Sequence, residues 1–150
     1  MRYLEIYEDE NYFYVVSECL KGDDVVENVW NAGSYTEAYA AGIIQQILLA
    51  VQYIHSKGVA HNQLYPVNIL HVNPNAPIIK VIDLDEAGSA PFKDMNKFMR
   101  GGDYRGCYVA PEIIKGDWNI KNDEWSVGIL MYYMLLGDIP FFGYDYKDTF

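Results

Sequence analysis

The sequence of 150 residues is poor in cysteine and in positive charge, and each shortage excludes a class of protein. Its two cysteines, Cys19 and Cys107, cannot form a disulfide framework or a cysteine-rich zinc site. The chain has 11 Lys and Arg residues against 21 Asp and Glu residues, and its formal net charge is −10. Nucleic acids and anionic membrane surfaces are therefore poor partners, because clustered positive charge is needed to bind them.

Long apolar runs and targeting patterns are missing as well. No apolar stretch reaches the roughly 18 residues of a membrane-spanning helix, and no signal-peptide pattern follows Met1. The hydrophobic share of 51% and the aromatic share of 15% are instead typical of a folded core. We therefore expect a folded, soluble protein of the cytoplasm.

Residue spacing predicts a hairpin followed by mainly helical structure. Two strands are expected over residues 3–7 and 12–17, on either side of a polar turn. Apolar residues recur at three- and four-residue spacing between Thr36 and Ser56, and Gly58 follows, which predicts a helix with a glycine at its end.

The second half of the chain predicts shorter strands, a loop and one more helix. Apolar side chains over residues 124–136 lie on every side of the expected helix, so we expect it to be buried all round. The other expected elements are a short helix over 25–31, strands over 69–72 and 78–82, and a long surface loop over 83–105.

Asn68, Asp83 and Asp85 are the first candidates for chemistry. An Asn that lies 15 residues before an Asp at the end of an apolar strand can supply oxygen ligands to Mg²⁺. Ordinary turn capping explains the same residues, and on spacing alone both interpretations stay open. His61 fits a satisfied imidazole better than a base, and the histidine spacing gives no zinc site.

Four motifs in order resemble the protein kinase family. Residues His61–Leu70 resemble the catalytic loop H-R-D-L-K-P-E-N-x-L, and Asp83–Asp85 stands in the place of D-F-G after a strand. Ala110–Glu112 matches A-P-E, and Asp123–Gly128 matches the D-x-W-S-x-G segment that opens a central helix. The residues between the motifs most resemble the calcium/calmodulin-dependent and calcium-dependent Ser/Thr protein kinases.

The resemblance implies an α+β, protein-kinase-like fold of which only part is present. Residues 1–18 would be a remnant of the small-lobe strands, and 19–150 a partial large lobe, mainly α-helical with short strands, from the hinge to the start of the seventh helix. The glycine-rich phosphate loop and the strand with the V-A-I-K lysine are absent from these residues, as is most of the small lobe.

The resemblance also implies a role for individual residues. Glu18 and Leu20 would contact adenine through their backbone, Leu70 would lie beneath the purine, and Asn68 and Asp83 would hold Mg²⁺. Mg²⁺–ATP is implied by resemblance only, and we expect it to bind weakly or not at all. Asp123 would bond the catalytic-loop backbone, and Ser17 would be a small gatekeeper residue.

The departures from the family pattern predict a loss of catalysis. Gln63 replaces the aspartate that accepts the substrate proton, and Tyr65 replaces the lysine that steadies the phosphoryl group. Arg105 replaces the threonine that bonds both of them. Asn62 replaces the Arg before that aspartate, and Asp85 replaces the glycine of D-F-G.

Two functions are therefore expected as alternatives. The first is a catalytically deficient domain, a pseudokinase of the calcium-dependent Ser/Thr type that acts by binding another protein. The second is an ATP-dependent Ser/Thr kinase with non-standard residues, in which Asp85 or Glu86 replaces the base and the small lobe lies outside this chain. We also expect self-association through exposed apolar surface, because the predicted central helix would be left partly uncovered.

Overall fold

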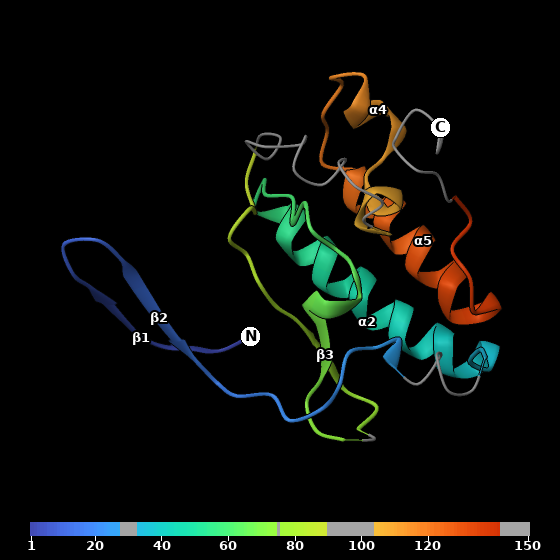
Figure 1. Cartoon of the computed structure of the whole chain (residues 1–150), viewed down its shortest axis with the longest axis horizontal. Helices are drawn as coiled ribbons and strands as arrows, with labels where there is room; N and C mark the ends of the chain where they lie inside the picture. Colours follow the sequence, from blue (N-terminus) through green and yellow to red (C-terminus); the bar gives the residue numbers. More distant parts are fainter. Residues whose placement is uncertain (28–32, 75, 90–103, 142–150) are drawn as a thin grey trace.

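The computed structural model describes residues 1–27, 33–74, 76–89 and 104–141. Strands β1 (Tyr3–Glu8) and β2 (Phe13–Ser17) form an antiparallel hairpin that projects away from the rest of the molecule (Figure 1). Its turn is held by Asp9, whose Oδ1 accepts hydrogen bonds from the amides of Asn11 and Tyr12, both at 2.8 Å. The predicted hairpin is confirmed, with boundaries that differ by one residue.

Helix α2 (Glu37–Ser56) is the longest element and begins and ends where the sequence predicts. The Thr36 hydroxyl accepts a hydrogen bond from the Tyr39 amide at 3.3 Å, which caps the first turn. Gly58 follows the helix with φ of 73°, a conformation that glycine adopts without steric cost. Five side chains of one face enter the core: Ala40, Ile43, Ile44, Ile47 and Val51.

Two short strands lie beside α2. A 3-10 turn, η1 (Pro66–Asn68), leads into β3 (Ile69–His71), which pairs with β4 (Ile79–Val81) in antiparallel register. Gln46 of α2 fastens this pair, because its side-chain amide donates to Pro77 O at 2.8 Å and accepts from the Ile79 amide at 3.1 Å. Both predicted strands are confirmed.

Helix α5 (Asn122–Leu136) packs along α2, and the core lies between them (Figure 1). The prediction from the apolar pattern that this helix is buried all round is wrong, and the prediction that it is left partly uncovered is confirmed. Met131, Tyr132 and Leu136 are 45%, 40% and 60% exposed, because α2 and the 3-10 helix η2 (Tyr104–Tyr108) cover only one side of α5. Its Val127, Leu130 and Met134 side chains face that covered side and are buried.

The segment predicted as a long surface loop, 83–105, lies mostly outside the described residues, and its described ends are fixed. Gly88 exchanges two backbone hydrogen bonds with Ala60, at 2.8 and 3.0 Å. After the gap, η2 places Cys107 and Tyr108 in the core, and α4 (Pro111–Ile114) follows. Of the helix predicted over 25–31, only the start is described, and there Val25 and Val26 form a buried turn.

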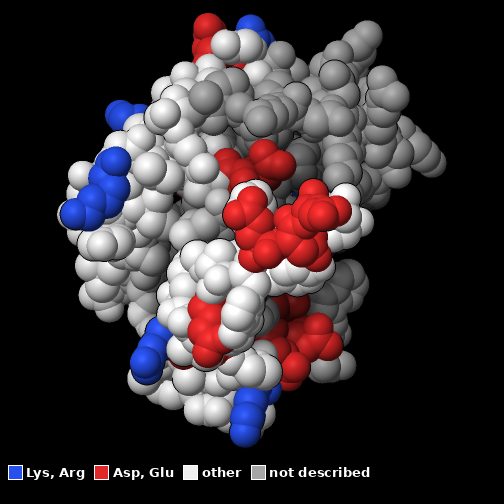
Figure 2. Space-filling model, turned by 90° about the vertical axis from the view of Figure 1, so that its left-hand side faces the viewer, with Lys and Arg blue, Asp and Glu red and all other residues white. Residues whose placement is uncertain are grey.

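Acidic side chains gather on the hairpin side of the molecule, and the basic ones lie at its margins (Figure 2). No helix in the described ranges is long and apolar enough to cross a membrane.

Candidate functional site

One buried carboxylate holds the backbone of the loop between α2 and η1. Asp123, at the start of α5, is completely buried; its Oδ2 accepts from the His61 amide at 2.7 Å and its Oδ1 from the Asn62 amide at 2.9 Å. The predicted bond between Asp123 and the loop backbone is confirmed. Asp123 Oδ2 also accepts a hydrogen bond at 2.8 Å from His55 Nε2 at the end of α2, which the sequence did not predict.

His61 is a satisfied core histidine, as expected. Its Nδ1 accepts from the Gln63 amide at 3.3 Å, so its Nε2 carries the proton that is donated to Ile82 O at 3.1 Å. Burial lowers the pKa of His61, with the Asp123 charge opposing the shift, and the neutral ring is favoured. Among the described residues, no cluster of His, Cys, Asp and Glu could hold a metal ion.

Gln63, Tyr65 and Arg105, three positions that depart from the kinase pattern, form one packed cluster. The Tyr65 hydroxyl donates to Gln63 Oε1 at 3.0 Å, and both side chains are buried. The Arg105 guanidinium lies 6.0 Å from the centre of the Tyr65 ring. Burial raises the pKa of the Tyr65 hydroxyl, although the Arg105 charge acts in the opposite direction, so the hydroxyl stays protonated as a donor.

Little room remains inside this cluster. The space between Gln63, Tyr65 and Arg105 and the neighbouring Tyr108 and Ser126 measures only about 10 Å³. That volume is at the lower limit for one water molecule. The amide and the phenol of this cluster can therefore orient hydroxyl groups by hydrogen bonding.

Asn68 and Asp83 come together at one end of the β3–β4 pair. Asn68 precedes β3 and Asp83 follows β4, and the Ile82 amide bonds Asn68 O at 2.9 Å. Asp83 has φ of 62°, which is uncommon for a residue with a Cβ atom and is often found at functional sites. The Asn68 side-chain amide donates to Gln63 O at 3.0 Å, which leaves its oxygen as the group available to a cation.

The residues expected to contact adenine are Glu18, Leu20 and Leu70, which lie in or near the same strand pair. Glu18 Oε1 accepts from Lys80 Nζ and from the Arg2 amide, both at 2.6 Å, and Lys80 pairs with Leu70 across the strands. The Lys80 ammonium, followed by the Arg2 amide, holds the pKa of the Glu18 carboxyl below its ordinary value. Lys80 therefore connects the two: its side chain bonds Glu18, and its backbone lies opposite Leu70 in the strand pair. Leu20, two residues after Glu18, is half-buried.

Asn62 has a structural role that the sequence did not indicate. It stands at φ of 67°, its side-chain amide donates to Glu86 O at 2.8 Å, and its oxygen accepts from Trp118 Nε1 at 3.1 Å. Glu86 and its neighbour Asp85 are exposed, and no bond from either carboxylate to Gln63 occurs within the described part of the chain. The sequence indicated only that Asn62 stands where the kinase pattern has an arginine. It gave no indication of a role for Trp118.

The segment before α5 is fastened to the same helix. Asn122 Oδ1 accepts from the Ala110 amide at 3.0 Å, the Ser126 hydroxyl donates to Tyr108 O at 2.7 Å, and Trp125 Nε1 donates to Cys107 O at 2.9 Å. Both sides of the candidate site therefore depend on the first turns of α5.

Comparison with known proteins agrees with this architecture. The family model for the protein kinase domain matches residues 1–150. Calcium-dependent protein kinase 4 of Plasmodium berghei is 34% identical over 150 residues, and calcium-dependent protein kinase 3 of Plasmodium yoelii yoelii is 33% identical over 144 residues. These matches cover 99% and 95% of this chain.

The solved structure of Rad53 1-466 in complex with AMP-PNP superimposes with a TM-score of 0.77 at 33% identity. The match covers 99% of this chain and 36% of that one, and the chain spans only 28% and 26% of the two Plasmodium kinases. These matches agree with the motifs and with the helices and strand pair described above. The chain belongs to the protein kinase domain family.

Proposed function

We propose that this chain is a catalytically deficient protein-kinase-like domain of the calcium-dependent Ser/Thr type that acts by binding another protein. The observation that carries the first half is the bond from Tyr65 to Gln63 Oε1 in the buried cluster. An amide cannot accept a proton near neutral pH, and Tyr65 brings no positive charge to the transferring phosphoryl group.

The energetic loss is large. Removal of one general base costs about 10²–10⁴-fold in rate. Here the cationic clamp is replaced as well, and the 150 residues contain no glycine-rich phosphate loop or V-A-I-K strand. We expect no measurable phosphotransfer from this chain.

The test restores the base alone. Gln63→Asp should transfer no labelled phosphate to a generic Ser/Thr peptide, because Tyr65 and Arg105 still occupy the place of the clamp. Gln63→Glu is the matched control for a longer carboxylate, and circular dichroism checks that both variants fold. Phosphate incorporation by the wild-type chain above a protein-free background would overturn the proposal of catalytic deficiency. Incorporation by Gln63→Asp alone would overturn the narrower prediction that Tyr65 and Arg105 still prevent transfer.

Nucleotide binding is a separate part of the proposal. Asn68 and Asp83 lie at adjoining strand ends and fit Mg²⁺ in ligand type, so Mg²⁺–ATP could still contact this lobe. We expect weak or undetectable binding, because adenine would meet only the Glu18–Leu20 and Leu70 side of its pocket. A thermal shift of several degrees with millimolar Mg²⁺–ATP, absent in Asp83→Asn, would contradict this expectation.

An ATP-dependent kinase with non-standard residues is the second candidate. It is favoured by the retained Asn68 and Asp83, and it needs a base from Asp85 or Glu86. Both are exposed, on a turn beyond Asp83, so they would have to move to reach the cluster. If Asp85→Asn or Glu86→Gln abolished a phosphotransfer that the wild-type chain performs, this second function would replace the first.

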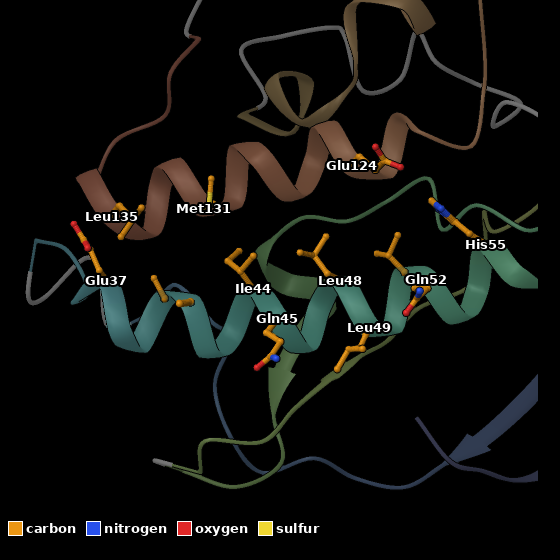
Figure 3. Close-up of a pocket in the computed structure, with 13 residues that line it drawn as sticks. Glu37, Ile44, Gln45, Leu48, Leu49, Gln52, His55, Glu124, Met131 and Leu135 are labelled. Atoms are coloured by element: carbon orange, nitrogen blue, oxygen red, sulfur yellow. The ribbon is translucent and has the colours of Figure 1, made fainter.

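A groove between α2 and α5 supports the protein-binding half (Figure 3). Its volume is about 840 Å³, and its side chains are mainly apolar. Leu48 of α2 and Met131 of α5 both line it and are each 45% exposed. It extends from Glu37 at one end to His55 and Glu124 at the other (Figure 3).

These features fit an amphipathic helix presented by another protein. Residues 37 to 55 of α2 extend for about 27 Å, enough to receive some five turns of a docked helix. The charged lining residues are Glu37 and Glu124, and no Lys or Arg lines the described groove. The partner helix should therefore carry an apolar stripe flanked by Lys or Arg.

A synthetic amphipathic helical peptide with Leu along one face and Lys beside it is the direct probe. We expect saturable binding by fluorescence anisotropy, weakened at least about tenfold by Leu48→Lys, because a buried charge opposes docking. Tyr53→Lys is the control, since Tyr53 is an exposed residue of α2 outside the groove. Equal binding of the peptide by both variants would refute the groove as its binding site. Equal binding of a peptide with Glu in place of Lys would refute it as well.

A further inference from the structure

A polar pocket lies where the start of α2 approaches the end of β3. Its volume is about 530 Å³, which is within the usual size range of sites for small ligands. Its walls come from separate stretches well inside the chain, and its lining residues are Asp23, Ser34, Tyr35, Thr36, Tyr39, His71 and Pro74. It shares none of them with the Gln63 cluster or with the groove between α2 and α5.

Hydrogen bonds fix the walls of this pocket to the rest of the fold. The backbone oxygen of Asp23 accepts from the His71 amide at 3.0 Å, which holds the Asp23 segment beside β3. The Tyr35 amide donates to Met134 O, near the end of α5, at 2.8 Å. The Tyr39 hydroxyl of α2 lies 3.2 Å from His71 Nε2. Because these walls are already in place, a ligand would lose little affinity to the ordering of the protein.

The Tyr39 hydroxyl presents an acceptor to the pocket. His71 Nδ1 lies 2.7 Å from Ala76 O, and since a carbonyl oxygen can only accept, Nδ1 carries a proton. In the neutral ring Nε2 therefore accepts from the Tyr39 hydroxyl. Burial raises the pKa of Tyr39, which keeps this hydroxyl protonated as the donor. The lone pairs of the Tyr39 oxygen remain for a ligand that donates.

The pocket also offers a negative charge beside aromatic rings. Within the part of the chain that the structure describes, the exposed Asp23 carboxylate has no hydrogen bond or ion pair. No Lys or Arg is among the lining residues. The rings of Tyr35 and Tyr39 have centres 4.6 Å apart and planes inclined by 53°. Tyrosine rings attract cations over their faces, so the carboxylate and the rings favour the same kind of ligand.

The start of a helix favours an anion, and that effect is countered here. The Thr36 hydroxyl already accepts from the Tyr39 amide at 3.3 Å, and Glu37 adds a negative charge to the first turn of α2. Asp23 adds a second one at the pocket itself. The balance of charge therefore favours a cation over a phosphate or a carboxylate.

We propose that this pocket binds a guanidinium group, with the Asp23 carboxylate as its ion-pair partner and Tyr35 and Tyr39 as its aromatic wall. A guanidinium is planar, so it can stack on a ring while its N–H groups donate in parallel to a carboxylate. A small guanidinium compound and an arginine side chain of a peptide carry the same group. The proposal is independent of the loss of catalysis and of the α2–α5 groove, because the pocket shares no residue with either site.

Nuclear magnetic resonance titration of the chain with two probes tests the pocket. Agmatine represents a free small molecule, and N-acetyl-arginine methylamide represents an arginine within a peptide. We expect the amide signals of Tyr35, Tyr39 and His71 to shift and saturate with a dissociation constant of about 1 mM. The probe that binds more tightly identifies the source of the group. The citrulline analogue of the second probe has nearly the same shape without the charge, so it should not shift these signals.

Two matched pairs of variants locate the binding. Asp23→Asn should weaken it at least about tenfold, because the charge is lost while the side-chain shape and the backbone bond to His71 remain. Asp24→Asn removes the same charge from the next residue, which lies outside the pocket and bonds the Val26 amide, and it should leave binding unchanged. Tyr39→Leu should weaken binding more than Tyr39→Phe, which keeps the ring.

Circular dichroism checks that all four variants are folded. No saturable shift with either guanidinium probe would overturn the proposal, as would an equal shift with the citrulline analogue. Equal effects of Asp23→Asn and Asp24→Asn would show that the bound charge lies elsewhere. A shift of the same signals by inorganic phosphate alone would show that the pocket binds anions, and would overturn the proposal too.

Discussion

Removal of the Asp123 carboxylate should destabilise this chain more than any other single change at its candidate site. The carboxylate is completely buried and accepts from two backbone amides, of His61 and Asn62, and from the His55 ring. In Asp123→Ala the two amides remain buried without an acceptor. Each orphaned buried donor costs about 1–3 kcal/mol, so the two amides together cost about 2–6 kcal/mol.

We therefore expect Asp123→Ala to lower the free energy of unfolding by about 2–6 kcal/mol, a large share of the about 5–15 kcal/mol of a typical domain. For a chain of this length, that corresponds to a fall in the melting temperature of about 4–24 °C. Asp123→Asn keeps the shape and one oxygen, so its loss should be smaller. Urea unfolding followed by circular dichroism measures both variants.

Glu124→Ala is the matched control for Asp123→Ala. Glu124 is the next residue, also an acid in the first turn of α5, but it is exposed. Its removal should cost at most about 1 kcal/mol, the usual value of a carboxylate near a helix N-terminus. If Asp123→Ala and Glu124→Ala lowered stability equally, the carboxylate would not hold the loop in the way we describe.

Two further predictions concern stability. Because the pKa of His61 is lowered in the folded chain, the unfolded state binds more protons just below pH 6.5, so stability should fall as pH decreases from 6.5. The urea midpoint, measured as a function of pH, should lose this part of its slope in His61→Gln. An unchanged slope in that variant would contradict the prediction. Gly58→Ala and Gly137→Ala both place a Cβ at positive φ, at a cost of about 1–2 kcal/mol, but only at Gly137 would the Cβ collide with Gly33 O. Gly137→Ala should therefore be the more destabilising of the two in thermal unfolding. Equal losses of stability would refute the clash.

Local signals explain what the sequence predicted well. The Thr36 cap, the spacing of apolar residues and Gly58 all lie within α2 or next to it, so the bounds of that helix could be predicted without knowledge of its neighbours. The same holds for the hairpin, whose turn is held by the local bonds of Asp9. The motif order identified the family because it fixes residue types at many positions at once.

The errors arise where the outcome depends on distant partners. Residues 124–136 are apolar on all sides, but how much of a helix is covered is decided by what packs against it, and Met131 and Leu136 are exposed. The Lys80–Glu18 ion pair joins residues 62 positions apart, and the Trp118–Asn62 bond joins residues 56 apart. No spacing rule along the chain predicts contacts of that range.

The contrast between an intact loop and altered chemistry has a physical basis. Asp123 holds the loop through the backbone amides of His61 and Asn62, and every residue type except proline offers such an amide. The loop can therefore keep its path whichever side chain stands at position 63. The buried side chains meet a different condition, because a buried polar group needs a hydrogen-bond partner. Gln63 supplies an acceptor and Tyr65 a donor, so the two side chains satisfy each other. The side-chain oxygen of Gln63 is thus held by the phenol of Tyr65 inside the buried cluster.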